Sequence, residues 1–137
     1  MKTIYISGNT EETIISGTVV SEAVRQKFSK AEKMLEERGF EVTNMFGEHM
    51  ARSTEVAFRW RYLRPDFSDI LLYRLHWLLE CHAIYMLPDF LDSPAAKVEH
   101  AFAIATGIVV YYDDELYANG TLRGKAYDEH RLPEVAP

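Results

Sequence analysis

Glu99 is the side chain with the clearest chemical potential in the sequence. It is the one acid of the helix expected within the segment DFLDSPAAKVEHAFAIATGIVVYY, residues 89–112. Pro94 suits the first position of a helix, where its missing N–H would be unpaired anyway, and Ser93 or Asp92 is the expected N-cap. Glu99 then lies about one and a half turns from the positive end of the helix, where a carboxylate is ionised more easily. An ionised carboxylate is the form that a nucleophile needs.

A second group of residues stands at the end of the first expected strand and in the loop that follows it: Tyr5, Ser7, Gly8 and Asn9. In an open parallel sheet, ligands bind beyond the carboxyl ends of the strands, near the point where the strand order reverses. The loop with Asp92 and Ser93 should reach the same edge, close to Glu99. This pattern predicts a site for a phosphate or a sugar. The same residues are also consistent with a plain turn and a solvated helix carboxylate.

Other patterns in the sequence give weaker indications of function. The segment from Arg59 to Arg64 could clamp a phosphate while Trp60 or Tyr62 stacks on a base, or it could be the solvated face of a helix. There is no GxxxxGK[ST] loop and no GxGxxG, so the sequence offers no support for an NTPase or a dinucleotide-binding protein. No metal site is expected, because metal-ligand spacing is absent among the five histidines: His49, His76, His82, His100 and His130.

Composition narrows the class of partner. The chain has 137 residues, a net charge of -6 and a pI near 5.3, whereas a surface that binds a nucleic-acid polymer needs a basic excess. No apolar run approaches the roughly 20 residues needed to cross a membrane. The single cysteine, Cys81, lies in an apolar stretch and is expected to be a reduced, buried thiol of a cytoplasmic protein.

The order of the expected elements indicates a single α/β domain over residues 1–137. Short apolar strands are expected at residues 2–7, 41–45, 83–87 and 108–112. Helices are expected at about 19–38, 67–80 and from Pro94 to Gly107. This alternation is typical of a doubly wound parallel sheet with helices on both faces. Residues 113–137 should form a peripheral C-terminal segment, with a short helix or hairpin followed by a loose tail.

Two stretches carry a resemblance to a known family: KTIYISG at the start, and LLECHAIYMLPDFLDSPAAKVEHAFAIATGI around Glu99. The chain resembles the nucleoside 2-deoxyribosyltransferase superfamily. It is most similar to the branch of small uncharacterised, DUF4406-like proteins with a segment of the type CDAIYLLPGWEDSxGAxxEHAxAxxxG. The resemblance covers most of residues 1–112. It implies a flavodoxin-like sheet that binds a nucleoside or nucleotide at its strand ends.

The resemblance also implies roles for individual residues. Glu99 matches the glutamate that attacks C1′ of the deoxyribose, and Tyr5 matches a tyrosine close to it. Asp92 and Ser93 would meet the sugar or base, and the loop Ser7–Asn9 would cover the sugar or a 5′-phosphate. The reaction would be a two-step displacement through a covalent glycosyl-Glu99 intermediate, which a second base or water releases. This chemistry needs no cofactor or metal. The substrate would be a (deoxy)nucleoside or its 5′-monophosphate.

The chain departs from its relatives at two positions, where Arg74 and His82 replace acidic residues of the active enzymes. The first loop also differs, because relatives favour Ser-Gly-Pro and this chain has Ser-Gly-Asn. A nucleotide-binding module that has lost turnover is therefore the alternative function, and an ion pair between Arg74 and Glu99 would favour it. A third interpretation is an interaction protein that uses the aromatic region Phe58–Tyr62. Small and apolar residues on the later helices favour a homodimer, as in the resembling proteins.

Overall fold

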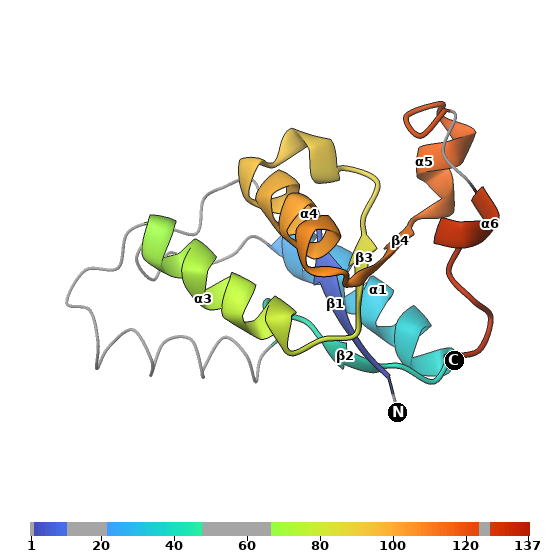
Figure 1. Cartoon of the computed structure of the whole chain (residues 1–137), viewed down its shortest axis with the longest axis horizontal. Coiled ribbons are helices and arrows are strands. Elements are labelled where there is room, and N and C mark those ends of the chain that lie inside the picture. The colour runs from blue at the N-terminus through green and yellow to red at the C-terminus, as the bar shows by residue number, and fades with distance from the viewer. Residues whose placement is uncertain (1, 11–21, 48–66, 124–126) are drawn as a thin grey trace.

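The computed structural model describes residues 2–10, 22–47, 67–123 and 127–137. Strands and helices alternate along this part of the chain (Figure 1). The strands are β1 (Thr3–Ser7), β2 (Glu41–Thr43), β3 (Ala83–Met86) and β4 (Val109–Tyr112). The helices are α1 (Glu22–Glu37), α3 (Phe67–Leu79), the 3-10 helix η1 (Phe90–Asp92), α4 (Pro94–Thr106), α5 (Asp114–Ala118) and α6 (Tyr127–His130).

The four strands form one all-parallel sheet in the order β2-β1-β3-β4. Tyr5 of β1 lies opposite Thr43 of β2 and Ile84 of β3 in this register. The order reproduces the first four strands of the flavodoxin-like arrangement, in which the strand order reverses between β1 and β3. The predicted doubly wound α/β fold is therefore confirmed, with strand limits that differ by one or two residues. A ligand site is expected where β1 and β3 end.

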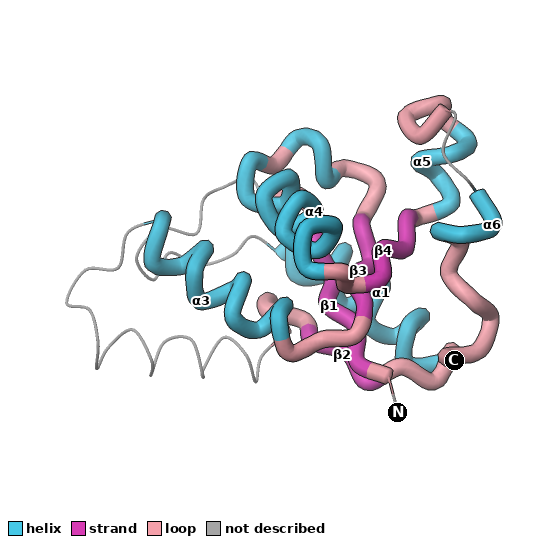
Figure 2. Tube along the Cα trace, viewed as in Figure 1, coloured by secondary structure: helices cyan, strands magenta, loops and turns pink. Residues whose placement is uncertain are grey.

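Helices cover both faces of the sheet, with α1 on one side and α3 and α4 on the other (Figure 2). The α1 face that contacts the sheet has apolar residues at helical spacing: Val24, Phe28, Ala31 and Leu35. Because parallel strands are covered on both faces, β3 is buried over its whole length. On α4, Ala95, Ala96 and Ala103 are buried, whereas Ala101 and Ala105 are exposed. The small buried residues let α4 lie close to the sheet.

Both ends of α4 are defined by local signals in the sequence. The Ser93 side chain accepts a hydrogen bond from the N–H of Ala96 over 3.0 Å, so Ser93, and not Asp92, is the N-cap. Pro94 occupies the first turn, as expected. Gly107 ends the helix with a φ of 76°, a left-handed conformation that glycine adopts without strain.

The C-terminal segment is attached to the domain, so the expectation of a loose tail was wrong. Arg131 forms a parallel bridge with Tyr112 at the end of β4. The N–H of Ala136 donates to the carbonyl of Arg38 over 2.7 Å, and the Arg38 guanidinium donates to the carbonyl of Leu132 over 3.2 Å. These contacts fasten the last residues to the end of α1.

The sequence predicted that Cys81 is a buried thiol and that no segment is apolar enough over its length to cross a membrane. Cys81 is buried and unbridged, and burial raises the pKa of its thiol, although a hydrogen bond with Thr43 opposes the shift. None of the helices in the described ranges is long and apolar enough to span a membrane.

Candidate functional site

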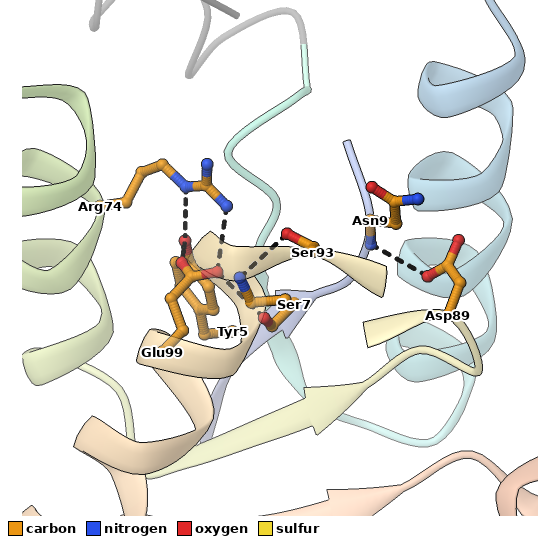
Figure 3. Close-up of polar contacts among 8 residues, drawn as sticks. Tyr5, Ser7, Asn9, Arg74, Asp89, Ser93 and Glu99 are labelled. Atoms are coloured by element: carbon orange, nitrogen blue, oxygen red, sulfur yellow. Dashed lines mark hydrogen bonds and ion pairs between the residues drawn. The ribbon is translucent and has the colours of Figure 1, made fainter. Parts of the chain in front are cut away.

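Four polar side chains meet in the interior between the sheet and the helices α3 and α4 (Figure 3). The Arg74 Nη2 atom lies 3.0 Å from the Oε1 atom of Glu99. The Ser7 hydroxyl donates to the same oxygen over 3.0 Å. The Tyr5 hydroxyl donates to the other oxygen, Oε2. We call these four residues, Tyr5, Ser7, Arg74 and Glu99, the Glu99 cluster.

The four members of the Glu99 cluster come from three elements, β1, α3 and α4. Tyr5 and Ser7 are two residues apart on β1, so both side chains face the same side of the sheet. That side is covered by α4, whose small residues bring Glu99 close to the strand. Arg74 comes from α3, which packs beside α4. The convergence of Tyr5, Ser7 and Glu99 was expected from the sequence.

The cluster is shielded from solvent. Glu99, Tyr5 and Ser7 are 0% exposed, and Arg74 is 4% exposed. A buried charge is costly unless it is paired and hydrogen-bonded, and here the carboxylate has a cation and two hydroxyl donors. The Arg74 guanidinium also lies 5.4 Å from the ring centroid of Phe46, within the range of a cation–π contact.

The protonation of two cluster members follows from this environment. Burial and then the Glu99 carboxylate raise the pKa of Tyr5 well above its usual range, against an opposing effect of Arg74. Burial alone would lower the pKa of Arg74, but the neighbouring Glu99 and Tyr5 outweigh it and raise this pKa above its usual range. Tyr5 is therefore a neutral hydroxyl donor and Arg74 a permanent cation at neutral pH.

The loop after β1 is fastened to the loop after β3. The N–H of Asn9 donates to Oδ1 of Asp89 over 3.0 Å (Figure 3). The other oxygen of Asp89 lies 2.5 Å from the Lys27 ammonium, which also donates to the Asn9 carbonyl over 2.5 Å. Gly8 packs against Leu87 in the same region. Gly8 and Asn9 thus lie at the predicted edge of the sheet, in contact with Leu87, Asp89 and Lys27.

The two residues predicted from the loop before α4 have different positions. Ser93 is 0% exposed, and its hydroxyl caps the helix that carries Glu99. Asp92 is exposed on η1 and does not belong to the Glu99 cluster. The structure therefore brings together Tyr5, Ser7 and Glu99, places Ser93 as their structural support, and leaves Asp92 at the surface.

His82, the second position at which the chain departs from the resembling enzymes, lies at the opposite end of the strands. Its Nδ1 accepts a hydrogen bond from the N–H of Thr3 over 3.2 Å, and Thr3 begins β1. Two predicted segments lie outside the described residues: Arg59–Arg64, which could clamp a phosphate, and Phe58–Tyr62, which could form a contact surface. Within the ranges that the structure describes, no group of three or more His, Cys, Asp or Glu side chains could hold a metal ion.

The contacts of Lys27 and Asp89 were not anticipated from the sequence. Lys27 is 62 positions from Asp89, and a lysine on a helix gives no sign of its partner. The resemblance to the superfamily marked Arg74 only as a departure from an expected acidic residue. The sequence had no means to show that it pairs with Glu99.

Comparison with known proteins identifies a family but no characterised relative. No curated protein and no solved structure matches the chain. The family model described as "Domain of unknown function (DUF4406)" matches residues 2–112, which include β1 to β4 and all four members of the Glu99 cluster. The chain therefore belongs to the DUF4406 family.

Proposed function

We propose that this chain is a nucleoside- or nucleotide-binding module in which glycosidic-bond cleavage has been lost. The observation that carries the proposal is the buried ion pair between Arg74 and Glu99, 3.0 Å apart. The proposal includes membership of the DUF4406 family in the nucleoside 2-deoxyribosyltransferase superfamily, which the sequence resembles. The expected place of binding is the edge where β1 and β3 end, the reversal point of a flavodoxin-like sheet.

The ion pair argues against Glu99 as an effective nucleophile. Nucleophilic attack requires a free lone pair and negative charge on an oxygen that can approach C1′. In this chain Oε1 accepts from Ser7 and Arg74, and Oε2 accepts from Tyr5. A carboxylate can accept about four hydrogen bonds, so some acceptor capacity is left on Oε2. Because Glu99 is 0% exposed, this remaining capacity is not open to C1′ of a sugar in the folded chain.

The leaving base would also lack a proton donor within the described part of the site. Cleavage of an N-glycosidic bond is assisted by a general acid that protonates the departing base. An arginine does not give up its proton in a protein, and Arg74 stands where relatives have an acid. The raised pKa of Tyr5 makes its hydroxyl a weak acid as well. Binding without turnover is the function that this donor set supports best.

Cleavage or base exchange through a covalent glycosyl-Glu99 intermediate is the second candidate. One specific observation favours it: Tyr5 and Ser7 hold the two oxygens of Glu99 in a defined orientation, as a positioned nucleophile requires. In this case Arg74 would have to withdraw from Glu99 when substrate enters. The homodimer expected from the sequence is compatible with both candidate functions.

A panel of deoxynucleosides and their 5′-monophosphates tests the two candidates. For a binding module, at least one ligand should raise the melting temperature of the wild-type protein, and chromatography should detect no free base. Glu99→Gln keeps the side-chain shape but removes the charge, so it should weaken ligand binding at a temperature at which circular dichroism shows that the variant is folded. Release of free base by the wild type, abolished in Glu99→Gln, would overturn the binding module in favour of the second candidate. A panel that neither shifts the melting temperature nor releases base would overturn both.

A further inference from the structure

In the part of the chain that the structure describes, β4 is the last strand at one edge of the sheet. The N–H groups of Val109 and Asp113 donate to carbonyl groups on the β3 side. Because the backbone groups of successive residues in a strand point in alternate directions, those of Val110 and Tyr112 point away from β3. This edge of β4 therefore presents polar backbone groups on the side where a further strand would lie.

A strand edge of this kind is a template for pairing with another chain. β4 has the sequence VVYY, which combines β-branched and aromatic residues and contains no charged residue and no proline. Charged side chains and prolines are two of the means by which proteins protect a sheet edge. Two copies of the same edge can pair about a two-fold axis, because each antiparallel strand then presents the same groups to the other. The partner that an uncovered β4 fits is therefore a second copy of this chain.

In this protein the C-terminal segment lies against the edge of β4 (Figure 1). The Nδ1 atom of His130, on α6, donates to the carbonyl of Val110 over 3.0 Å, and the His130 ring lies 5.2 Å from the ring of Tyr112. Arg131 forms a parallel bridge with Tyr112. These contacts engage both residues of β4 whose backbone groups point away from β3.

The same segment is held at its other end by α1. Leu132 is buried in the hydrophobic core. The Arg38 guanidinium donates to the carbonyls of Leu132 and Pro133, over 3.2 Å in each case. The segment follows residue 112, where β4 and the match to the family model both end. It is therefore an addition to the matched domain, and it packs on that domain through backbone and side-chain contacts.

We propose that residues 127–137 form an edge cover, which prevents β4 of one molecule from pairing with β4 of a second copy. Release of the edge cover exposes the backbone groups of Val110 and Tyr112, and antiparallel pairing of two such edges joins two four-stranded sheets. A homodimer of the wild-type protein therefore has to use another surface. The contacts that carry this inference do not involve the Glu99 cluster, so it is independent of the proposed function.

Substitutions within the whole chain test the edge cover. Leu132→Asp places a charge in the core and should release the cover, whereas Val135→Asp makes the same kind of change at an exposed residue of the same segment. Hydrogen exchange in residues 127–137 should become faster in Leu132→Asp and stay unchanged in Val135→Asp. At equal protein concentration, sedimentation equilibrium should give Leu132→Asp about twice the molar mass of the wild type and of Val135→Asp.

Val109→Lys distinguishes pairing through β4 from other kinds of association. Val109 is exposed, and a charge on an edge strand opposes pairing with a copy that carries the same charge. The double variant Leu132→Asp with Val109→Lys should therefore return to the wild-type mass while its cover stays released. A doubled mass that persists in this double variant would overturn the inference, because the association would not involve β4.

Arg38→Met provides a second test if circular dichroism shows that Leu132→Asp is unfolded. It removes two hydrogen bonds to the edge cover and leaves Leu132 unchanged. This variant should speed hydrogen exchange in residues 127–137, and its average mass should rise in proportion to the released fraction. A released cover without any rise in mass, or a cover that stays protected in every folded variant, would overturn the inference.

Discussion

The Arg74–Glu99 ion pair should be among the strongest single determinants of stability in this fold. In Arg74→Met, the Glu99 carboxylate would stay in an environment where it is 0% exposed and would retain only the hydroxyl donors Tyr5 and Ser7. Removing one partner of a buried ion pair typically costs about 3–5 kcal/mol, because the other charge is left uncompensated. For a domain of this size such a loss lowers the melting temperature by roughly 10–20 °C. Glu99→Gln should cost a similar amount, since it leaves the guanidinium unpaired.

The double variant Arg74→Met with Glu99→Gln separates the interaction energy of the ion pair from the contribution of each side chain alone. It removes both charges together, so it should be less destabilised than either single variant, and the coupling energy should reach roughly 3 kcal/mol. Urea unfolding measured by circular dichroism gives these free energies, provided that the m-value stays the same in all variants.

Lys27→Met is the control, because it breaks an ion pair of which both side chains are 30% exposed. An exposed pair contributes about 0–1 kcal/mol, so this variant should unfold at nearly the same urea concentration as the wild type. Additive effects of Arg74→Met and Glu99→Gln, or a loss in Arg74→Met no greater than in Lys27→Met, would refute the reasoning.

Three further predictions concern individual contacts. Ser93→Ala removes the acceptor for the N–H of Ala96 and should reduce the free energy of unfolding by about 1 kcal/mol, as read from urea midpoints; an unchanged midpoint would contradict the capping role. Gly8→Ala puts a methyl group against Leu87 and should cost about 1–3 kcal/mol in the same measurement, whereas an unaltered stability would contradict the close approach. The pKa of Tyr5 is raised in the folded state, so its contribution is complete below about pH 10 and is lost as the pH rises further. Unfolding followed from pH 8 to 11 should therefore show a shallower loss of stability above pH 10 in Tyr5→Phe, and parallel curves would contradict the raised pKa.

The candidate site could be predicted in part because its elements carry local signals. Residues near Glu99 specify the start and end of α4 through a capping serine, a proline and a terminal glycine. These interactions span only a few positions, so the sequence contains everything that decides them. Once the strands are recognised as parallel, their carboxyl ends must lie at one edge, which brings Ser7 toward the helix of Glu99.

The expectation of a loose C-terminal tail was wrong because the contacts of the tail are not local in the sequence. Its contacts with Arg38 and Tyr112 involve residues about 100 and 19 positions away, respectively, and the polar composition of residues 113–137 gives no sign of them. Ala136 and Leu132 are fastened through backbone atoms, whose hydrogen bonds depend on position and not on side-chain type.

The sequence by itself determined the parallel α/β fold, the limits of α4 and the meeting of Tyr5, Ser7 and Glu99, because the alternation of strands with helices and the helix caps are patterns along the chain. Only the tertiary structure decided that Arg74 neutralises Glu99 and that Asp89 covers the turn after β1. Apolar residues occur on several faces of α3, including the exposed Leu72 and Leu79, so its pattern does not specify which face lies inward. The packing of α3 against α4 chooses that face, and this choice places Arg74 against Glu99 in a buried ion pair.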